Sequence, residues 1–468
     1  MAKDDSASGV RVMSRSMVKA SVRRPRVVLP VSNLDLLFQD TPASMLCLYR
    51  KPSSSSGDFE DVVAGFKAKL PSLLDHFYPL AGRIVADPRS GLPEIHCDNQ
   101  GLEVIVGEVG EALGSLHYGD LAASLARIGI PVQYSADAIL TLQLVSFACG
   151  GFAVAWAGSH MALDGSAICT IANAWSDLAA GCSGTISAAP PNYDRSVFRP
   201  RAPPAYNSSI GELYALLDSK HLVNALTAGA SFVGRTYYVE ERDLVMLRAQ
   251  AGGPRTSRVE AVSAYLWKVF ASVVGSSDET CRMAWWVNGR RHLTTTAPAE
   301  AMRNYIGNVT SYAVAEASVE GVKRRPLQGI ASMMRESIKS TATDEHFQQV
   351  VDWVEDHKGK DKQGTAAKYV EAAAIGLGSP LLGVTSFASF PFNTDFGFGQ
   401  AAYAMPAWVD SGRLCFGFVI ITTSPGGSSL FFSMSIWPSL AAALDSDEQR
   451  IFKPLTAEYL GLAKNSRL

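Results

Sequence analysis

The chain has 468 residues and a formal net charge of −2, and 47% of its residues are hydrophobic and 18% are charged. This length favours two domains of roughly 200 residues each over a single core. The near-neutral charge excludes a general attraction to nucleic acid or to anionic membranes.

The seven cysteines are scattered and form no C-x-x-C pair, which is typical of reduced thiols in a cytosolic protein. The first 20 residues lack the apolar segment of a secretory signal, and Asp4 and Asp5 argue against a transit peptide. We therefore expect a cytoplasmic protein. The histidines form no H-x-x-x-H pattern and no metal-binding pairing with nearby cysteines, so no metal is expected.

The first strong element is a helix over residues 58–77, in which apolar residues recur at helical spacing. Residues 138–159 carry no charge and are long enough to imitate a membrane span. A Gly-Gly pair interrupts this segment, however, so two buried strands joined by a turn are expected instead. The second strand leads into SHMALDGSA at residues 159–167, and a helix that ends at Gly181 follows.

The second half begins after a proline-rich stretch without periodicity at residues 188–206. We expect an N-terminal domain over residues 1–200, a crossover linker over 201–222 and a C-terminal domain over 223–468. A capping box at Ser257 predicts the start of a further helix. Strands and helices alternate without a regular βαβ rhythm, so two α/β domains of similar size, each with a mixed sheet, are the expected fold.

Three motifs stand out. His160 and Asp164 of HMALDG lie where a strand enters a helix, although H-x-x-x-D alone occurs often by chance. NGR, which ends at Arg290, is followed by YIGN. DFGFG at residues 395–399 contains the D-F-G of kinases, but neither a glycine-rich phosphate loop nor an H-R-D loop accompanies it. We therefore expect Asp395, with Gly397 and Gly399, to form a tight structural turn.

Taken in order, HMALDG, NGR, YIGN and DFGFG resemble the motifs of the plant BAHD acyl-CoA-dependent acyltransferases. HFYPLAGRI at residues 76–84 and LPVSNLDLL at residues 29–37 are also similar to that family's N-terminal segments. The resemblance implies two α/β domains of the chloramphenicol-acetyltransferase type, with a channel between them and the histidine at its centre. It also implies a monomer of plant specialised metabolism that uses acyl-CoA as a co-substrate and holds no permanent cofactor.

The expected chemistry follows from the thioester, which is already activated and needs only a base for the acceptor proton and a donor for the tetrahedral oxyanion. Histidine suits the first role because its pKa lies near neutrality, so His160 is the expected general base. The resemblance implies that Thr385 of VTSF stabilises the intermediate and that Asp164 pairs with Arg290 instead of orienting the histidine. Gly165 is expected to let the backbone turn tightly into the following helix.

The phosphates of CoA need local positive potential. The helix start at Thr256, Ser257 and Arg258 offers backbone N–H groups and a guanidinium, as is typical of phosphate sites. The resemblance adds Arg291 and His292 as further contacts. A capped surface helix and a solvated basic turn are the alternatives.

The acceptor is less constrained. Phe387 stands where the family usually has a tryptophan, as does Phe398 of DFGFG, and phenylalanine lacks the indole N–H donor. The arginine with which relatives grip acidic acceptors aligns with Ala372, which disfavours a carboxylate acceptor. With Phe390 and Phe392, the aromatic cluster favours a neutral, apolar or phenolic alcohol, with an amine also open. A hydroxycinnamoyl donor is the expected acyl group.

Two other functions remain open at this point. A condensation-type domain that uses carrier-bound acyl groups shares the H-x-x-x-D-G motif, but the free-standing chain and DFGFG argue against it. A non-catalytic small-molecule-binding protein on the same scaffold is suggested by the loss of both tryptophans. Release of thiol from a panel of CoA esters would separate the binding protein from the enzymes.

Overall fold

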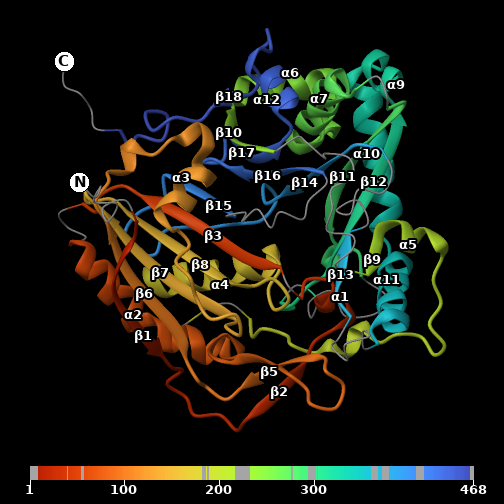
Figure 1. Cartoon of the computed structure of the whole chain (residues 1–468). Helices are drawn as coiled ribbons and strands as arrows, with labels where there is room; N and C mark the ends of the chain where they lie inside the picture. The colour runs from red at the N-terminus through yellow and green to blue at the C-terminus, as the bar shows by residue number, and fades with distance from the viewer. Residues whose placement is uncertain are drawn as a thin grey trace, which may run out of the picture.

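The computed structural model describes residues 9–39, 41–53, 57–181, 186, 189–216, 232–275, 278–293, 302, 304–359, 367–371, 379–406 and 416–463. Two large sheets, each with its own helices, lie side by side (Figure 1), the first drawn mainly in red to yellow and the second mainly in green to blue. The expected mixed α/β fold is confirmed.

The first sheet has six strands, in the order β1 (Arg11–Val18), β6 (Leu102–Val109), β7 (Leu140–Phe147), β8 (Phe152–Ser159), β3 (Pro42–Tyr49) and β15 (Tyr403–Pro406). Only β6 and β7 are parallel neighbours. β7 and β8 form the antiparallel hairpin that residues 138–159 predict, and both are buried along nearly their whole length. Their burial explains why this segment is free of charge.

Helices α2 (Phe59–His76) and α4 (Gly165–Ala180) cover one face of this sheet and contact each other. α2 is the helix predicted over residues 58–77. Phe66 of α2 and Trp175 of α4 lie with their ring centroids 5.0 Å apart in the core that they share with the strands. This packing fixes the start of α4 directly after the turn that contains His160.

The second sheet has seven strands, in the order β12 (Thr310–Ser318), β11 (Thr280–Asn288), β14 (Leu381–Ser386), β16 (Gly417–Thr423), β17 (Leu430–Ile436), β10 (Val233–Val239) and β18 (Lys453–Pro454). β14 runs parallel to both of its neighbours, β11 and β16. The longest of the helices that bury apolar side chains in the core of this sheet are α7 (Arg258–Val273) and α10 (Leu327–Thr341), and α12 (Pro438–Asp445) adds to the same core.

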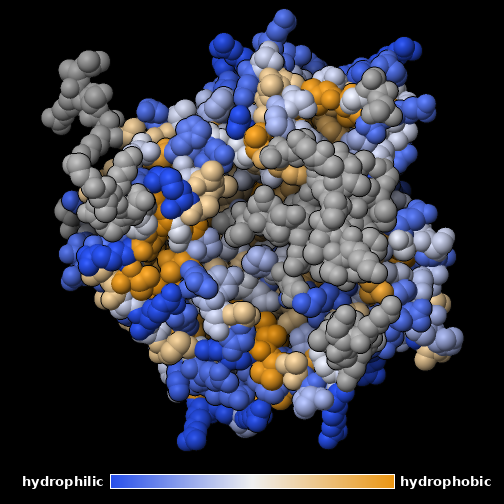
Figure 2. Space-filling view, viewed as in Figure 1, coloured by the Kyte–Doolittle hydropathy of each residue, from blue (hydrophilic) through white to orange (hydrophobic). Residues whose placement is uncertain are grey.

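The remaining described elements are smaller. They are the sheet of β2 (Val27–Pro30), β5 (Pro93–Cys97) and β4 (Arg83–Ala86), the pair β13 (Tyr369–Glu371) and β9 (Tyr214–Leu216), and the helices α1 (Asn33–Leu36), α3 (Leu121–Ile128), α5 (Ser208–Leu213), α6 (Glu241–Gln250), α9 (Val319–Arg324) and α11 (Asp344–His357). Among the described residues, no helix has the length and apolar character needed to cross a membrane. On the face drawn in Figure 2, apolar residues show only in small separate patches between polar ones.

The chain does not divide simply at the expected crossover, residues 201–222. Part of that stretch forms α5 and β9, and β9 pairs with β13 from far along the chain. β15 falls within the expected C-terminal range, 223–468, yet it pairs with β3 of the first sheet. Proline content could not reveal these pairings because they join segments distant in sequence. The last strand of the first sheet therefore comes from the second half of the chain.

Candidate active site

His160 lies directly after β8, in the turn that leads to α4. Its backbone N–H donates to the carbonyl of Thr41, with N and O 2.9 Å apart. The Phe38 ring stacks on the imidazole, with the ring centroids 4.3 Å apart and the planes 16° apart. These contacts hold both the backbone and the ring plane of the histidine.

A cavity of about 470 Å³ opens beside His160 and draws its walls from both halves of the molecule. Thr385 at the end of β14 lines it, as do Phe387 and Phe390 just beyond that strand. The start of α7 lines it as well. The structure thus brings the predicted base, the predicted oxyanion donor and part of the predicted CoA site into one space.

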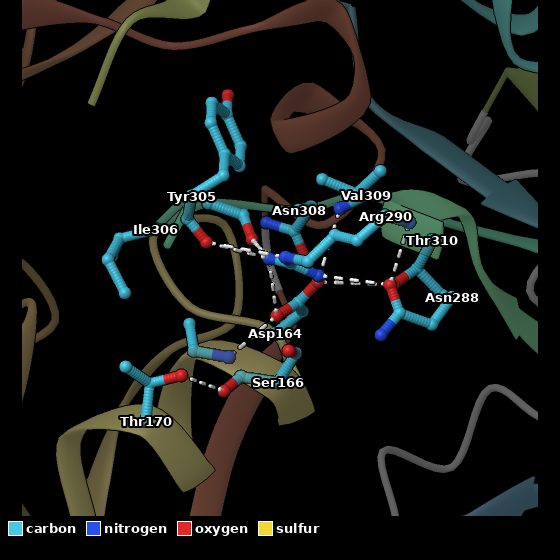
Figure 3. Close-up of polar contacts among 12 residues, drawn as sticks. Asp164, Ser166, Thr170, Asn288, Arg290, Tyr305, Ile306, Asn308, Val309 and Thr310 are labelled. Atoms are coloured by element: carbon cyan, nitrogen blue, oxygen red, sulfur yellow. Dashed lines mark hydrogen bonds and ion pairs between the residues drawn. The ribbon is translucent and has the colours of Figure 1, made fainter. Parts of the chain in front are cut away.

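Asp164 does not contact His160 but forms a buried ion pair with Arg290 (Figure 3). Arg290 Nη1 lies 2.6 Å from Asp164 Oδ2 and Nη2 lies 3.0 Å from Oδ1, so the pair is bidentate. Arg290 also donates to the carbonyl of Gly307 at 2.7 Å. Asp164 in turn accepts from the backbone N–H groups of Ala167 and Val309. The pairing that the resemblance implies is therefore present, and it joins the start of α4 to the second sheet.

The two buried groups have shifted pKa values. Burial lowers the pKa of His160 below its usual value, and the nearby charge of Asp164 opposes that shift only in part. The pKa of Asp164 is also lowered: burial alone would raise it, but the charge and hydrogen bonds of Arg290 outweigh that effect. His160 is thereby favoured as a neutral imidazole near pH 7, and Asp164 as a carboxylate.

The sequence analysis did not identify the partner that His160 does have, which is Asn308. His160 Nδ1 and Asn308 Oδ1 are 3.1 Å apart. Asn308 is the last residue of YIGN, but nothing in that motif connects it to the histidine 148 residues earlier. Asp35 of α1, which contacts Asn308, lies in LPVSNLDLL, a segment that the sequence analysis noted only for its resemblance to the family and to which it assigned no role.

Gly165 lies at the first position of α4, and its φ is not in the left-handed region. The expected tight turn is therefore not its reason for being glycine. A β-carbon at this position would lie 2.6 Å from Cε1 of Phe387, well inside van der Waals contact. Glycine is needed here for space, because the Phe387 ring approaches the helix start.

The start of α7 has the predicted capping box. The Ser257 hydroxyl accepts from the N–H of Glu260, and the Glu260 carboxylate accepts from the N–H of Ser257. Ser257 and Arg258 line the cavity beside His160. Thr256 does not, because it is buried and its hydroxyl donates to the carbonyl of Ala251 at 2.9 Å.

Several predicted contacts lie elsewhere. Arg291 and His292 are exposed in the turn that contains Arg290, and neither lines the cavity beside His160. Phe392 lines an adjoining cavity of about 190 Å³, which shares Phe387 as a wall. Ala372 lies outside the described residues.

DFGFG forms the structural turn that the sequence predicts. Asp395 Oδ1 accepts from the backbone N–H groups of Gly397 and Gly399, at 2.9 and 3.0 Å. Both glycines have left-handed φ values, of 96° and 87°. The Phe398 ring packs between Phe66 and Phe152 of the first core. The motif thus holds the segment that leads to β15 against α2.

A second cavity, of about 540 Å³, lies elsewhere in the molecule. It lies between α3 and the strands β10 and β17, and none of the predicted site residues lines it. We place the candidate active site at the smaller cavity because only that one contains ionisable groups in the arrangement that the chemistry requires.

Comparisons with known proteins identify the family of the chain. The Transferase family model matches residues 8–421. The hydroxycinnamoyltransferase of Narcissus pseudonarcissus is 27% identical over 446 residues, which cover 91% of this chain and 96% of that protein.

Solved structures extend the likeness to the fold. Vinorine synthase matches with a TM-score of 0.68 and 21% identity, over 97% of this chain and 98% of its own. F. graminearum TRI101, crystallised with coenzyme A and T-2 mycotoxin, matches with a TM-score of 0.71 and 13% identity, over 91% and 99% of the two chains. Both show the same two-domain α/β fold. The family match and its acyltransferase relatives, together with the fold, define a two-domain acyltransferase. This chain belongs to the BAHD acyltransferases of the Transferase family.

Proposed function

We propose that this acyltransferase moves an acyl group from a CoA thioester to the hydroxyl or amine of a small plant metabolite, with His160 as the general base. The acceptor O–H or N–H gives its proton to Nε2 of His160 as its oxygen or nitrogen attacks the thioester carbonyl. The tetrahedral intermediate then breaks its C–S bond, and the same proton passes from the imidazole to the CoA thiolate. The ester or amide and free CoA leave, and the histidine returns to its neutral form.

The observation that carries this proposal is the shared cavity. A neutral, partly buried histidine and the Thr385 hydroxyl line one space between the two sheets. In that role Thr385 would donate its hydroxyl proton to the oxyanion, which gains most from a donor in a site that excludes water. Asp164 has no part in proton transfer because Arg290 occupies both of its carboxylate oxygens. Its role is to hold the loop and the helix start in place.

For the donor, we propose that the phosphates of CoA lie at the start of α7. Positions 258 and 259 are the first two of the helix, where backbone N–H groups have no partner within the helix. Arg258 adds a positive charge, and Arg335 neutralises Glu260 with a nitrogen–oxygen distance of 2.9 Å. Arg291 and His292 would contact CoA only where it extends beyond the cavity.

For the substrates, we propose a hydroxycinnamoyl donor and a neutral, phenolic or aliphatic alcohol acceptor. The phenyl rings of Phe387 and Phe390 offer an apolar wall beside His160. The similarity to hydroxycinnamoyltransferases supports the acyl group. An amine acceptor stays open.

The test is thiol release from acetyl-, malonyl-, benzoyl- and hydroxycinnamoyl-CoA in the presence of a panel of alcohols and amines. We expect the wild type to turn over at least one pair and His160→Ala to lose nearly all of this turnover while it still binds CoA. His117→Ala, which changes an exposed histidine, serves as the control. Undiminished turnover by His160→Ala would contradict the assignment, and no thiol release from any ester by the wild type would favour a binding protein.

A further inference from the structure

The side-chain amide of Asn308 has only one orientation that satisfies its neighbours. On one side its Nδ2 lies 3.0 Å from Asp35 Oδ1, 2.9 Å from the carbonyl oxygen of His160 and 2.9 Å from that of Met161. All three are acceptors, so the NH₂ group must face them. The amide oxygen therefore points toward His160 Nδ1.

This orientation decides which ring nitrogen carries the proton. An amide oxygen can only accept a hydrogen bond, so the Nδ1 that faces it must carry a hydrogen. A neutral imidazole has one N–H, and the other nitrogen then has a free lone pair. Within the part of the chain that the structure describes, His160 Nε2 has no hydrogen-bond partner, and it remains for a substrate in the cavity.

Asp35 keeps the amide from rotating. Its Oδ1 accepts from both the backbone N–H of Asn308, at 2.7 Å, and Nδ2, at 3.0 Å. Its Oδ2 accepts from the backbone N–H of Ser32 at 2.9 Å and lies 3.2 Å from Nε of the buried Arg195. Asp35 is fully buried. A flipped amide would turn its oxygen toward this carboxylate, and the repulsion between two acceptors in a buried setting disfavours that state.

We infer that Asn308, anchored by Asp35, is the positioning residue that fixes the proton of neutral His160 on Nδ1 and leaves Nε2 as the base. The inference rests on the proposed function only where it names Nε2 as the catalytic base. The tautomer itself is a property of the free protein. In catalytic triads a carboxylate in contact with the histidine does this work. Here the carboxylate lies one amide further away, so the histidine is oriented without an anion directly at Nδ1.

This arrangement has a chemical consequence for the base. The charged groups around His160 are Asp164 and Asp35, and each is paired with an arginine, Arg290 and Arg195 respectively. A neutral amide at Nδ1 stabilises the imidazolium less than a carboxylate there would. His160 therefore stays unprotonated to lower pH than a triad histidine, and it returns its proton readily to a departing thiolate.

The direct test is the tautomer. The protein is labelled with ¹⁵N-histidine, and the ring-nitrogen resonances of His160 are assigned by their loss in His160→Gln. We expect a protonated Nδ1 and an unprotonated Nε2 in the wild type at pH 7 to 8, and a population with a protonated Nε2 in Asn308→Ala. An Nε2-protonated His160 in the wild type would overturn the inference. This measurement needs no substrate, so it still decides the question if the wild type proves to lack transferase activity and the proposed function fails.

The second test is the pH profile of kcat/KM for Asp35→Asn/Asn308→Asp, which exchanges the amide and the carboxylate, so that a carboxylate lies against Nδ1 without a second carboxylate beside it. We expect the acidic limb of the profile to move upward by about one pH unit or more, because an adjacent anion favours the imidazolium. Asn173→Asp is the matched control. It makes the same change on α4, where Asn173, among the residues that the structure describes, binds the backbone of residues 391 and 393. A limb that moves no further in Asp35→Asn/Asn308→Asp than in Asn173→Asp would contradict a positioning role, since a merely structural asparagine would lower the rate without moving the limb.

Discussion

Gly165 and Phe387 both line the cavity beside His160, and they lie so close together that no methyl group fits between them. A β-carbon on residue 165 would meet Cε1 and Cζ of the ring at 2.6 and 2.8 Å. The helix that follows the histidine and the segment that follows Thr385 are therefore fitted to each other. The Phe390 ring, with its centroid 5.7 Å from that of Phe387, limits how far the Phe387 ring can retreat.

Gly165→Ala is expected to lower kcat/KM because the new methyl group displaces Phe387 into the cavity. Alanine is favoured over glycine within a helix by roughly 0.5–1 kcal/mol, so the change would stabilise an uncrowded helix start. Kinetics and thermal unfolding of the single variant and of Gly165→Ala/Phe387→Leu measure the effect. The shorter side chain should restore most of the activity. Gly110→Ala, at a position with nothing within 4 Å of the added carbon, is the control. Equal effects at the two glycines would contradict the contact.

Asp164→Ala is expected to destabilise the protein by roughly 3–5 kcal/mol, because it leaves the buried guanidinium of Arg290 without its counter-ion. Asp164→Ala/Arg290→Met should be less damaging, since both charges leave together. Urea unfolding measures the free energy in each case. Glu108→Ala removes one side of the exposed pair between Arg11 and Glu108 and should cost less than about 1 kcal/mol. A loss of similar size at both pairs would show that the buried one does not hold the loop.

Arg258→Ala is expected to raise KM for acyl-CoA about tenfold with little change in kcat, which corresponds to about 1.4 kcal/mol of binding free energy. The guanidinium lies at the cavity and donates to the carbonyl of Gly427, so its loss also loosens the neighbouring turn. Steady-state kinetics with the donor varied give both constants. Arg255→Ala, three residues earlier and exposed, is the matched change of charge. A fall in kcat at unchanged KM would move the CoA phosphates away from α7.

The stability of the protein is expected to fall as the pH drops from about 6.5 toward 4, because of His346. Burial lowers the pKa of His346 from its ordinary value of 6.5 to about 4, and its Nε2 lies 2.8 Å from the Ser311 hydroxyl. The folded state therefore binds fewer protons than the unfolded state in this window, and acid favours unfolding, by an amount on the order of 2–3 kcal/mol.

Urea unfolding of the wild type and of His346→Gln at pH 7, 6, 5 and 4 measures this contribution. The variant should lose less stability over that range than the wild type does. His117→Gln, at an exposed histidine, should keep the wild-type slope. If all three proteins have the same slope, His346 is not buried as a neutral group.

Local patterns allowed several of the helices and strands to be predicted. The capping box of Ser257 and Glu260 involves residues three apart, and the hairpin of β7 and β8 turns within a few residues, so both are visible in sequence. Of the candidate site, His160 was singled out by its motif and by the chemistry of histidine, and Thr385 by the resemblance. The pairing of Asp164 with Arg290 was found through the resemblance alone.

Long-range contacts could not be predicted in the same way. Asp35, His160 and Asn308 meet only because α1, the turn after β8 and the YIGN segment converge at one point. The steric reason for glycine at position 165 likewise depends on the ring of Phe387, which lies 222 positions further along the chain (387 − 165). Apart from the Asp164–Arg290 pair, which the resemblance implied, the residues that meet in the site are neighbours only in space, and no local pattern in the sequence indicated their contacts.

The pairing of β15 with β3 sets the order in which the protein can mature during synthesis. The ribosome delivers residues 42–49 first, whereas residues 403–406, which complete that edge, follow only after residues 50–402 have been made. Until then β3 exposes a row of unpaired peptide groups, the kind of edge on which nascent chains associate with one another. A chain that stops short of β15 therefore leaves the first sheet without its edge strand, so the two halves of the chain complete their folding together.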